Sequence, residues 1–105
     1  MSKLSITTDA DWLHNPHAGE LLVLEFMEPV ALDVPALAAA IAVEPARLHA
    51  MIDGKVRIDG ELDLRLARYF RMSEGFFLRL QDQFELREAR RMLNGDLERI
   101  VPRAA

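Results

Sequence analysis

The chain has 105 residues, of which 50% are hydrophobic and 29% are charged, and its formal net charge is −4. This length and composition are typical of one small globular domain that buries a single core without metals or disulfides. The absence of cysteine excludes a disulfide framework, thiol catalysis and a cysteine-based zinc site. No apolar run approaches the roughly 18 residues of a membrane span. The N-terminus also lacks the charged segment followed by an apolar segment that a signal peptide has. We therefore expect a cytoplasmic protein that does not enter a membrane.

The negative charge is concentrated in the first third of the chain. Residues 1–33 contain six Asp and Glu against Lys3 alone, a net of −5, so residues 34–105 together carry +1. An acidic protein is an unusual binder of nucleic acid, because phosphate neutralisation supplies most of the non-specific affinity. An acidic face could bind a basic protein, while a mildly basic face opposite it could bind DNA. Ordinary solvated surface is the alternative explanation.

The first predicted helix covers residues 18–27. Its apolar side would carry Leu21, Leu22 and either Phe26 or Leu24. We expect it to end at Glu28, because the residue before a proline avoids the helical region. The predicted organisation is an N-terminal extension (1–13), a domain (14–95) and a frayed C-terminal tail (96–105).

Residues 34–54 have the pattern of two short helices joined by a tight turn. Asp33 can cap the first helix, Pro45 suits the first turn of the second, and Asp53-Gly54 can end it. Ala38 leaves room for two helix axes to approach closely, and Val43 can fill the angle between them. The apolar positions recur at helical spacing on both segments: Leu37, Ala38 and Ile41 on the first, and Leu48, Met51 and Ile52 on the second.

Two further helices are predicted after this pair. Asp59 can cap a helix over residues 60–70, and Ser73 can cap a long final helix that ends at Asn94-Gly95. The expected core positions are Leu62, Leu66 and Phe70 on the former and Phe76, Leu80 and Phe84 on the latter. The final helix is longer than the core of the domain requires. Its surplus apolar residues therefore predict a homodimer or partner interface formed by Phe84, Leu86, Met92 and Leu93, unless this segment packs on its own chain.

A helix-turn-helix places its second helix in the major groove of DNA. The outward positions of the second helix are Ala46, Arg47, His49 and Ala50. Arginine can bind guanine with two hydrogen bonds, histidine can donate or accept, and alanine permits close approach to a thymine methyl group. Lys55 and Arg57 follow in a loop from which they could hold phosphates. The alternative for these residues is plain solvation. Double-stranded operator DNA is the predicted ligand.

Other kinds of site have little support in the sequence. His14 and His17 with Asp9 and Asp11 lack any fixed helical spacing of metal ligands, and we expect them to be surface residues. No phosphate-binding glycine loop, nucleophile elbow or catalytic triad is present. We therefore expect no enzymatic activity, no catalytic residue, no metal and no cofactor.

Several linked segments resemble the HigA-type antitoxins of bacterial toxin-antitoxin modules, within the Xre/Cro helix-turn-helix class. The similar blocks are NPHAGELL (15–22), LHAMIDGKVRI (48–58), LRLARYF (64–70) and MSEGFFLRLQDQFEL (72–86). The resemblance implies an all-α, five-helix, lambda-repressor-like helix-turn-helix domain with a long C-terminal helix. It also implies a homodimer that binds and silences a small basic ribonuclease toxin and represses its own operon.

Three departures from the family pattern concern DNA binding. Asp33-Val34 stands where relatives have Ser-Gln, so position 34 of the DNA-binding face loses an amide donor and a carboxylate lies near phosphate. Ala42 occupies the usual turn glycine, where a left-handed conformation costs about 1 kcal/mol. Val56 replaces an arginine. Two alternatives to the antitoxin therefore remain, namely a stand-alone helix-turn-helix regulator and a protein-interaction module that has lost DNA reading.

Overall fold

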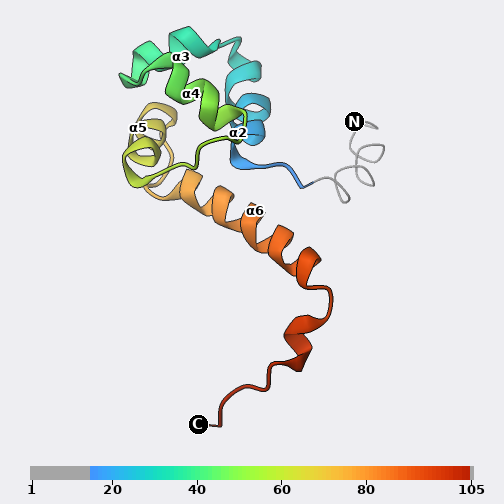
Figure 1. Ribbon diagram of the computed structural model, residues 1–105. Coiled ribbons are helices and arrows are strands. Elements are labelled where there is room, and N and C mark those ends of the chain that lie inside the picture. Colours follow the sequence, from blue (N-terminus) through green and yellow to red (C-terminus); the bar gives the residue numbers. More distant parts are fainter. Residues whose placement is uncertain (1–14, 105) are drawn as a thin grey trace.

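The computed structural model describes residues 15–104, and within this range it contains helices and no strand. The head of the molecule consists of α2 through α5 and the start of α6 (Figure 1). The predicted all-α fold is thus confirmed, whereas the predicted extension (1–13) lies outside the described residues. The helices are α2 (Ala18–Leu21), the π-helix η1 (Leu22–Met27), the 3-10 helix η2 (Glu28–Val30), α3 (Val34–Ile41), α4 (Pro45–Ile52), α5 (Gly60–Phe70), α6 (Phe76–Leu93) and the 3-10 helix η3 (Asp96–Arg99).

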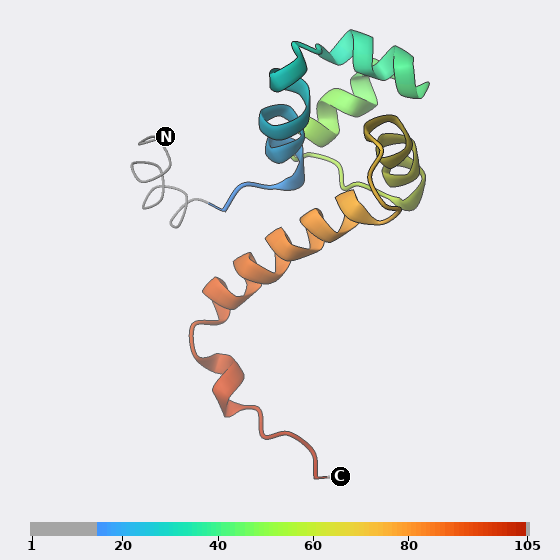
Figure 2. The same cartoon turned by 180° about the vertical axis from the view of Figure 1, so that it is seen from behind.

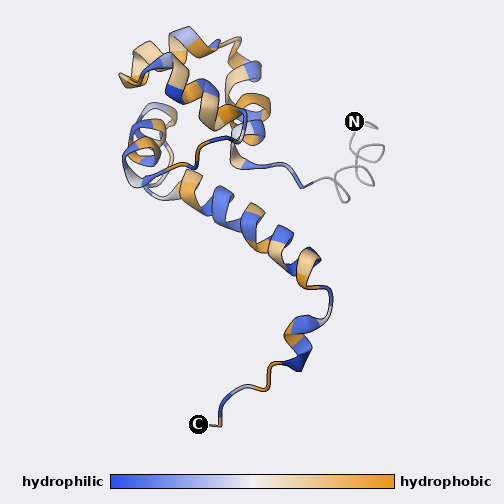
Figure 3. Cartoon of the chain, viewed as in Figure 1, coloured by the Kyte–Doolittle hydropathy of each residue, from blue (hydrophilic) through white to orange (hydrophobic). Residues whose placement is uncertain are grey.

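One hydrophobic core lies where the short helices meet the first half of α6. Leu22, Leu37, Leu48, Leu62 and Phe77 come from five different elements, and each of them is fully buried. The second half of α6 projects away from this head, and η3 with the C-terminal segment continues outward (Figure 2). Every helix of the head carries apolar residues, and α3 consists almost entirely of them (Figure 3). The core therefore holds α3 and α4 in a fixed relation to α5 and α6.

The predicted helix pair is present over α3 and α4. Ala38 is 1% exposed at the contact between the two helices. Its carbonyl oxygen accepts a hydrogen bond of 2.9 Å from the backbone N–H of Val43, which is itself buried in the turn. Asp33 caps α3, and Ala42 adopts the left-handed conformation at φ 59°. Gly54 follows α4 at φ 80°. Local sequence signals thus define both ends of the pair.

The first helical segment is longer than predicted. It does not stop before Pro29 but continues through η1 and η2 and ends at Ala31, which is left-handed at φ 54°. Pro29 is accommodated because it lies in the first turn of η2, where its missing N–H leaves no hydrogen bond unmade. The apolar side uses Phe26, whose ring centroid lies 5.2 Å from that of Phe77. Leu24, the other candidate, is exposed.

The start of α6 also differs from the prediction. Ser73 does not cap this helix. The N-cap position is occupied by Gly75, which has no side chain with which to cap the helix. The side chain of Ser73 instead accepts a hydrogen bond from Arg79 at 2.9 Å. The buried carboxylate of Asp63, in α5, caps α6 in its place by accepting from the backbone N–H groups of Gly75, Phe77 and Leu78 at 2.6, 2.8 and 3.1 Å.

The core-facing side of α6 centres on Phe77 and Gln81, which are buried, rather than on the predicted stripe. Phe76, Leu80 and Phe84 are half-buried beside them. The prediction chose the stripe with the larger number of apolar residues and missed Gln81 because it is polar. No helix within residues 15–104 combines the length and apolar character needed to cross a membrane.

Candidate nucleic-acid interface

The outward side of α4 is formed by short side chains and one histidine. Leu48 and Met51 turn inward and are buried. Ala46 and His49 are consequently exposed, and Ala50 is half-buried. The His49 imidazole has no hydrogen-bond or ion-pair partner within the described part of the chain. The short side chains therefore leave room for close approach to a groove of DNA, and the His49 imidazole can donate or accept a hydrogen bond there.

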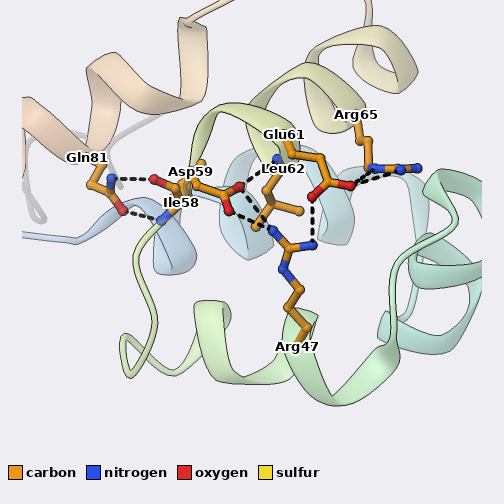
Figure 4. A network of polar contacts seen from close by, with 7 residues as sticks. All are labelled: Arg47, Ile58, Asp59, Glu61, Leu62, Arg65 and Gln81. Atoms are coloured by element: carbon orange, nitrogen blue, oxygen red, sulfur yellow. Dashed lines mark hydrogen bonds and ion pairs between the residues drawn. The ribbon is translucent and has the colours of Figure 1, made fainter.

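Arg47 lies on the same helix but is engaged by carboxylates (Figure 4). Its Nη2 atom lies 3.0 Å from both carboxylate oxygens of Asp59, and its Nη1 atom lies 3.5 Å from Glu61. The Arg47 side chain is 33% exposed. The structure thus places Arg47 at the predicted position, and it directs the guanidinium toward α5.

The loop after α4 carries the two predicted phosphate-binding cations. Lys55 is exposed and has no side-chain partner among residues 15–104. Arg57 is exposed as well, but its guanidinium binds Glu85 of α6 at 2.7 and 3.1 Å and lies 3.7 Å from Asp82. Only Lys55 of this pair is therefore unengaged.

A buried glutamine attaches this loop to α6. The Gln81 side chain accepts from the backbone N–H of Ile58 at 2.6 Å and donates to the Ile58 carbonyl at 3.0 Å. Both polar groups of a buried backbone unit are thereby satisfied. A polar residue four positions after Phe77, within an apolar helix face, was the signal in the sequence for this contact.

The N-terminus of α3 presents a carboxylate and an apolar side chain where a helix end could otherwise bind phosphate. Val34 is half-buried and packs against the core, so it offers no polar group. The Asp33 carboxylate accepts from the backbone N–H of Ala36 at 2.9 Å. One N–H group at the helix end is thus already satisfied, and a negative charge lies beside it.

The predicted interface residues on α6 separate into two groups. Phe84 is half-buried, and its ring lies 5.9 Å from that of His17 with an edge-on geometry. Phe84 thus packs on its own chain, as in the alternative considered for this segment. Leu86, Met92 and Leu93 are 55%, 82% and 37% exposed. These three side chains remain available for a partner.

Asn15 connects the beginning of the described chain to α6, a role that the sequence did not reveal. Its Nδ2 atom donates to the Phe84 carbonyl and to the Glu88 carboxylate, both at 3.0 Å, and its Oδ1 atom accepts from Arg87 at 3.1 Å. Side chains separated by about seventy positions in sequence cannot be paired from periodicity. Asn15 therefore helps to hold α6 against α2.

The histidines and acids considered as metal ligands are only partly described. His17 is the N-cap of α2, where its Nδ1 atom accepts from the backbone N–H of Gly19 at 3.0 Å. His14, Asp9 and Asp11 lie outside the described residues. Within residues 15–104 no group of three or more His, Asp and Glu is arranged to hold a metal ion.

Comparison with known sequences identifies a curated relative over most of the chain. No protein-family model matches this chain. Virulence-associated protein I of Dichelobacter nodosus is 34% identical over 73 residues, which are 70% of this chain and 68% of that protein.

Solved structures share the fold over nearly their whole length. Antitoxin HigA of Pseudomonas aeruginosa, solved with the higBA promoter, has a TM-score of 0.74 and 26% identity, covering 88% of this chain and 100% of that one. A HigA-family addiction module antidote protein of Coxiella burnetii has a TM-score of 0.76 and 27% identity, covering 87% of this chain and 99% of that one. This chain belongs to the HigA-type antitoxin family of helix-turn-helix proteins.

Proposed function

We propose that this protein is an antitoxin that binds operator DNA through α4 and represses its own operon. The observation that carries the DNA-binding part is the outward face of α4. Ala46, His49 and Ala50 lie on it, while Leu48 and Met51 fix the other side of the helix in the core. A rigid helix with small outward residues fits the major groove. The similar antitoxin of Pseudomonas aeruginosa, solved with promoter DNA, supports this assignment.

Each residue of the proposed face has a distinct role. His49 would contact a base edge, and Ala46 and Ala50 would allow α4 to approach a thymine methyl group. Lys55 would hold a phosphate. The Arg57 guanidinium already binds Glu85 through Nε and Nη2, so its contribution to affinity should be smaller than that of Lys55. Val34 would contact the DNA backbone by van der Waals packing alone.

The test is fluorescence anisotropy with a labelled duplex from the region upstream of the operon, measured over a range of salt concentrations. We expect the logarithm of the affinity to fall linearly with the logarithm of the salt concentration. Lys55→Ala should reduce that slope by about 1, and His49→Ala should relax the preference at one base pair. Arg71→Ala removes an exposed cation at the end of α5 and should change neither. Affinity that does not respond to salt would contradict DNA binding.

The partner proposed for the antitoxin activity is a small basic toxin. Residues 15–46 contain Glu20, Glu25, Glu28, Asp33 and Glu44 and neither Lys nor Arg. Such a surface attracts a basic protein at long range. Expression from the native operon should therefore yield a complex in which this chain co-purifies with a small basic protein. Repeated isolation of the chain alone would contradict toxin binding.

One observation favours a second candidate, a protein-interaction module without DNA reading. The arginines of α4 and of the following loop are both bound to carboxylates, and Val34 offers no donor to phosphate. The same anisotropy experiment decides between the two candidates. Operator binding that depends on Lys55 and His49 excludes the second candidate.

A further inference from the structure

Four side chains form a continuous ion-pair cluster beside the proposed DNA-binding face. The Arg47 cluster consists of Arg47, Asp59, Glu61 and Arg65 (Figure 4). Glu61 accepts from Arg65 at 3.0 Å, and Arg65 also donates to the carbonyl oxygen of Ile41 at 2.9 Å. Since Arg47 belongs to α4, the two acids to the start of α5 and Ile41 to the end of α3, the cluster joins three helices.

The contacts of Arg47 leave it poorly suited to read a base. A guanine contact uses two N–H groups of the guanidinium fork. In Arg47, Nη2 faces both oxygens of Asp59 and Nη1 faces Glu61. Asp59 is itself held in place, because its Oδ1 atom also accepts from the backbone N–H of Leu62 at 2.9 Å. Reading a base would therefore require Arg47 to leave a carboxylate that has a second, structural hydrogen bond.

The charges of the cluster matter for a surface that faces phosphate. Asp59 and Glu61 are 62% and 58% exposed. With Arg47 and Arg65 present, the cluster is neutral. Without Arg47, one negative charge in excess would lie next to the outward side of α4, where it would repel DNA.

On the basis of the proposed DNA-binding function, we propose that Arg47 is a positioning residue and not a base reader. It neutralises Asp59 and Glu61 and fixes α4 against α5, so that Ala46, His49 and Ala50 face the groove. Sequence preference would then depend on those three residues. Arg47 would contribute to affinity equally for every operator sequence.

Four proteins test this role: the wild type, Arg47→Ala, the double variant Asp59→Asn/Glu61→Gln, and the triple variant that combines them. Asparagine caps a helix as well as aspartate does, so the double variant should keep the start of α5 intact. We expect Arg47→Ala to weaken operator binding about tenfold, by the same factor for each single base-pair change in the operator. In the triple variant the acids that repel DNA are gone, so affinity should return to within about threefold of the wild type.

A base-reading role predicts different results. Arg47→Ala would lose discrimination at one base pair, and the triple variant would bind as weakly as Arg47→Ala. Either result would overturn the proposal. Arg68→Ala is the matched control, because Arg68 is an exposed cation of α5 with no ion-pair partner among residues 15–104. It should leave the base preference and most of the affinity unchanged.

A wild-type protein that shows no salt-dependent operator binding would overturn the DNA-binding function and, with it, the role of Arg47 toward DNA. The structural part of the proposal has its own measurement in thermal unfolding of the same four proteins. Losses in Tm that are smaller in the triple variant than the sum of the other two would show that Arg47 and the two acids stabilise each other. Additive losses would overturn the structural role.

Discussion

The carboxylate of Asp63, in α5, accepts a hydrogen bond from the backbone N–H of Phe77, in α6, at 2.8 Å. The first N–H groups of a helix have no partner within the helix and need one from outside. Asp63 supplies it from a different helix, and its negative charge also lies at the positive end of the α6 dipole. The side chain is therefore both the cap of α6 and the polar connection between α5 and α6.

Asp63→Asn should lower the free energy of unfolding by about 2 kcal/mol, because an amide NH2 group would replace one of the two accepting oxygens and leave at least one backbone N–H at the start of α6 unpaired. Urea denaturation measures this loss. Asp82→Asn is the control, since it makes the same change at an exposed position of α6 and should cost less than about 0.5 kcal/mol. Equal losses in the two variants would contradict the capping role.

A second prediction concerns Gly19, where α2 packs against the end of α4. A Cβ atom at Gly19 would lie 2.6 Å from the carbonyl oxygens of both Met51 and Ile52. Because these are backbone atoms, Gly19→Ala should force α2 and α4 apart and lower the free energy of unfolding by about 1–3 kcal/mol.

Gly60→Ala is the matched control for Gly19. Among residues 15–104, a Cβ atom there meets no neighbouring atom within 4 Å, so this variant should be neutral or more stable by up to about 1 kcal/mol. Thermal unfolding of both variants checks the pair of predictions. A stable Gly19→Ala protein would show that α2 and α4 do not approach each other as closely as in the structure.

The elements whose signals are local could be predicted from the sequence. Asp33 and Asp59 each cap a helix by accepting from the backbone N–H three residues ahead. The small size of Ala38 indicates a close helix contact. These contacts join residues that are close to each other in the sequence. The helix-turn-helix and the position of its outward face followed from them.

The relations that were missed join residues distant in sequence. Asp63 replaces Ser73 as the cap of α6 because a buried carboxylate from α5 reaches the helix end, which no local pattern reveals. Similarly, Arg47 lies outward on α4 as periodicity predicts, but its engagement depends on Asp59 and Glu61 lying beside it in space. The position of a candidate site residue on its helix was predictable, but the ion pairs that its side chain forms were not.

The turn of the helix pair contains a residue in an unfavourable conformation. Ala42 has φ 59°, which costs an alanine about 1–2 kcal/mol and a glycine almost nothing. Ala42→Gly should therefore raise the free energy of unfolding by about 0.5–1 kcal/mol, after the greater entropy of glycine in the unfolded chain is subtracted.

The control for Ala42 makes the same substitution within α3. Ala39 lies in the helix and is exposed, so Ala39→Gly should lower stability by about 1 kcal/mol. Chemical denaturation of the two variants should thus give changes of opposite sign. A loss of stability in both would mean that the left-handed conformation at position 42 is not populated.

The exposed apolar side of α6 leads to a prediction about assembly. Leu86 and Leu93 are seven residues apart, and Leu86 lies nine residues after Phe77, so both leucines face away from the core at the helical period of 3.6 residues. Met92 is exposed as well, at 82%, but it borders this stripe, because one residue turns it about 100° around the helix from Leu93. A symmetric dimer formed through α6 would cover these side chains and present two copies of α4 to half-sites about 34 Å apart.

The double variant Leu86→Glu/Leu93→Glu should therefore shift the protein from dimer to monomer in sedimentation equilibrium and weaken binding to a palindromic operator more than binding to a half-site. Leu64→Glu is the control, because it places the same charge on an exposed leucine of α5 and should leave the dimer intact. Circular dichroism should show unchanged helix content in all variants, since the substituted side chains face solvent. A wild-type protein that sediments as a monomer at concentrations at which it binds the palindrome would rule out this dimer.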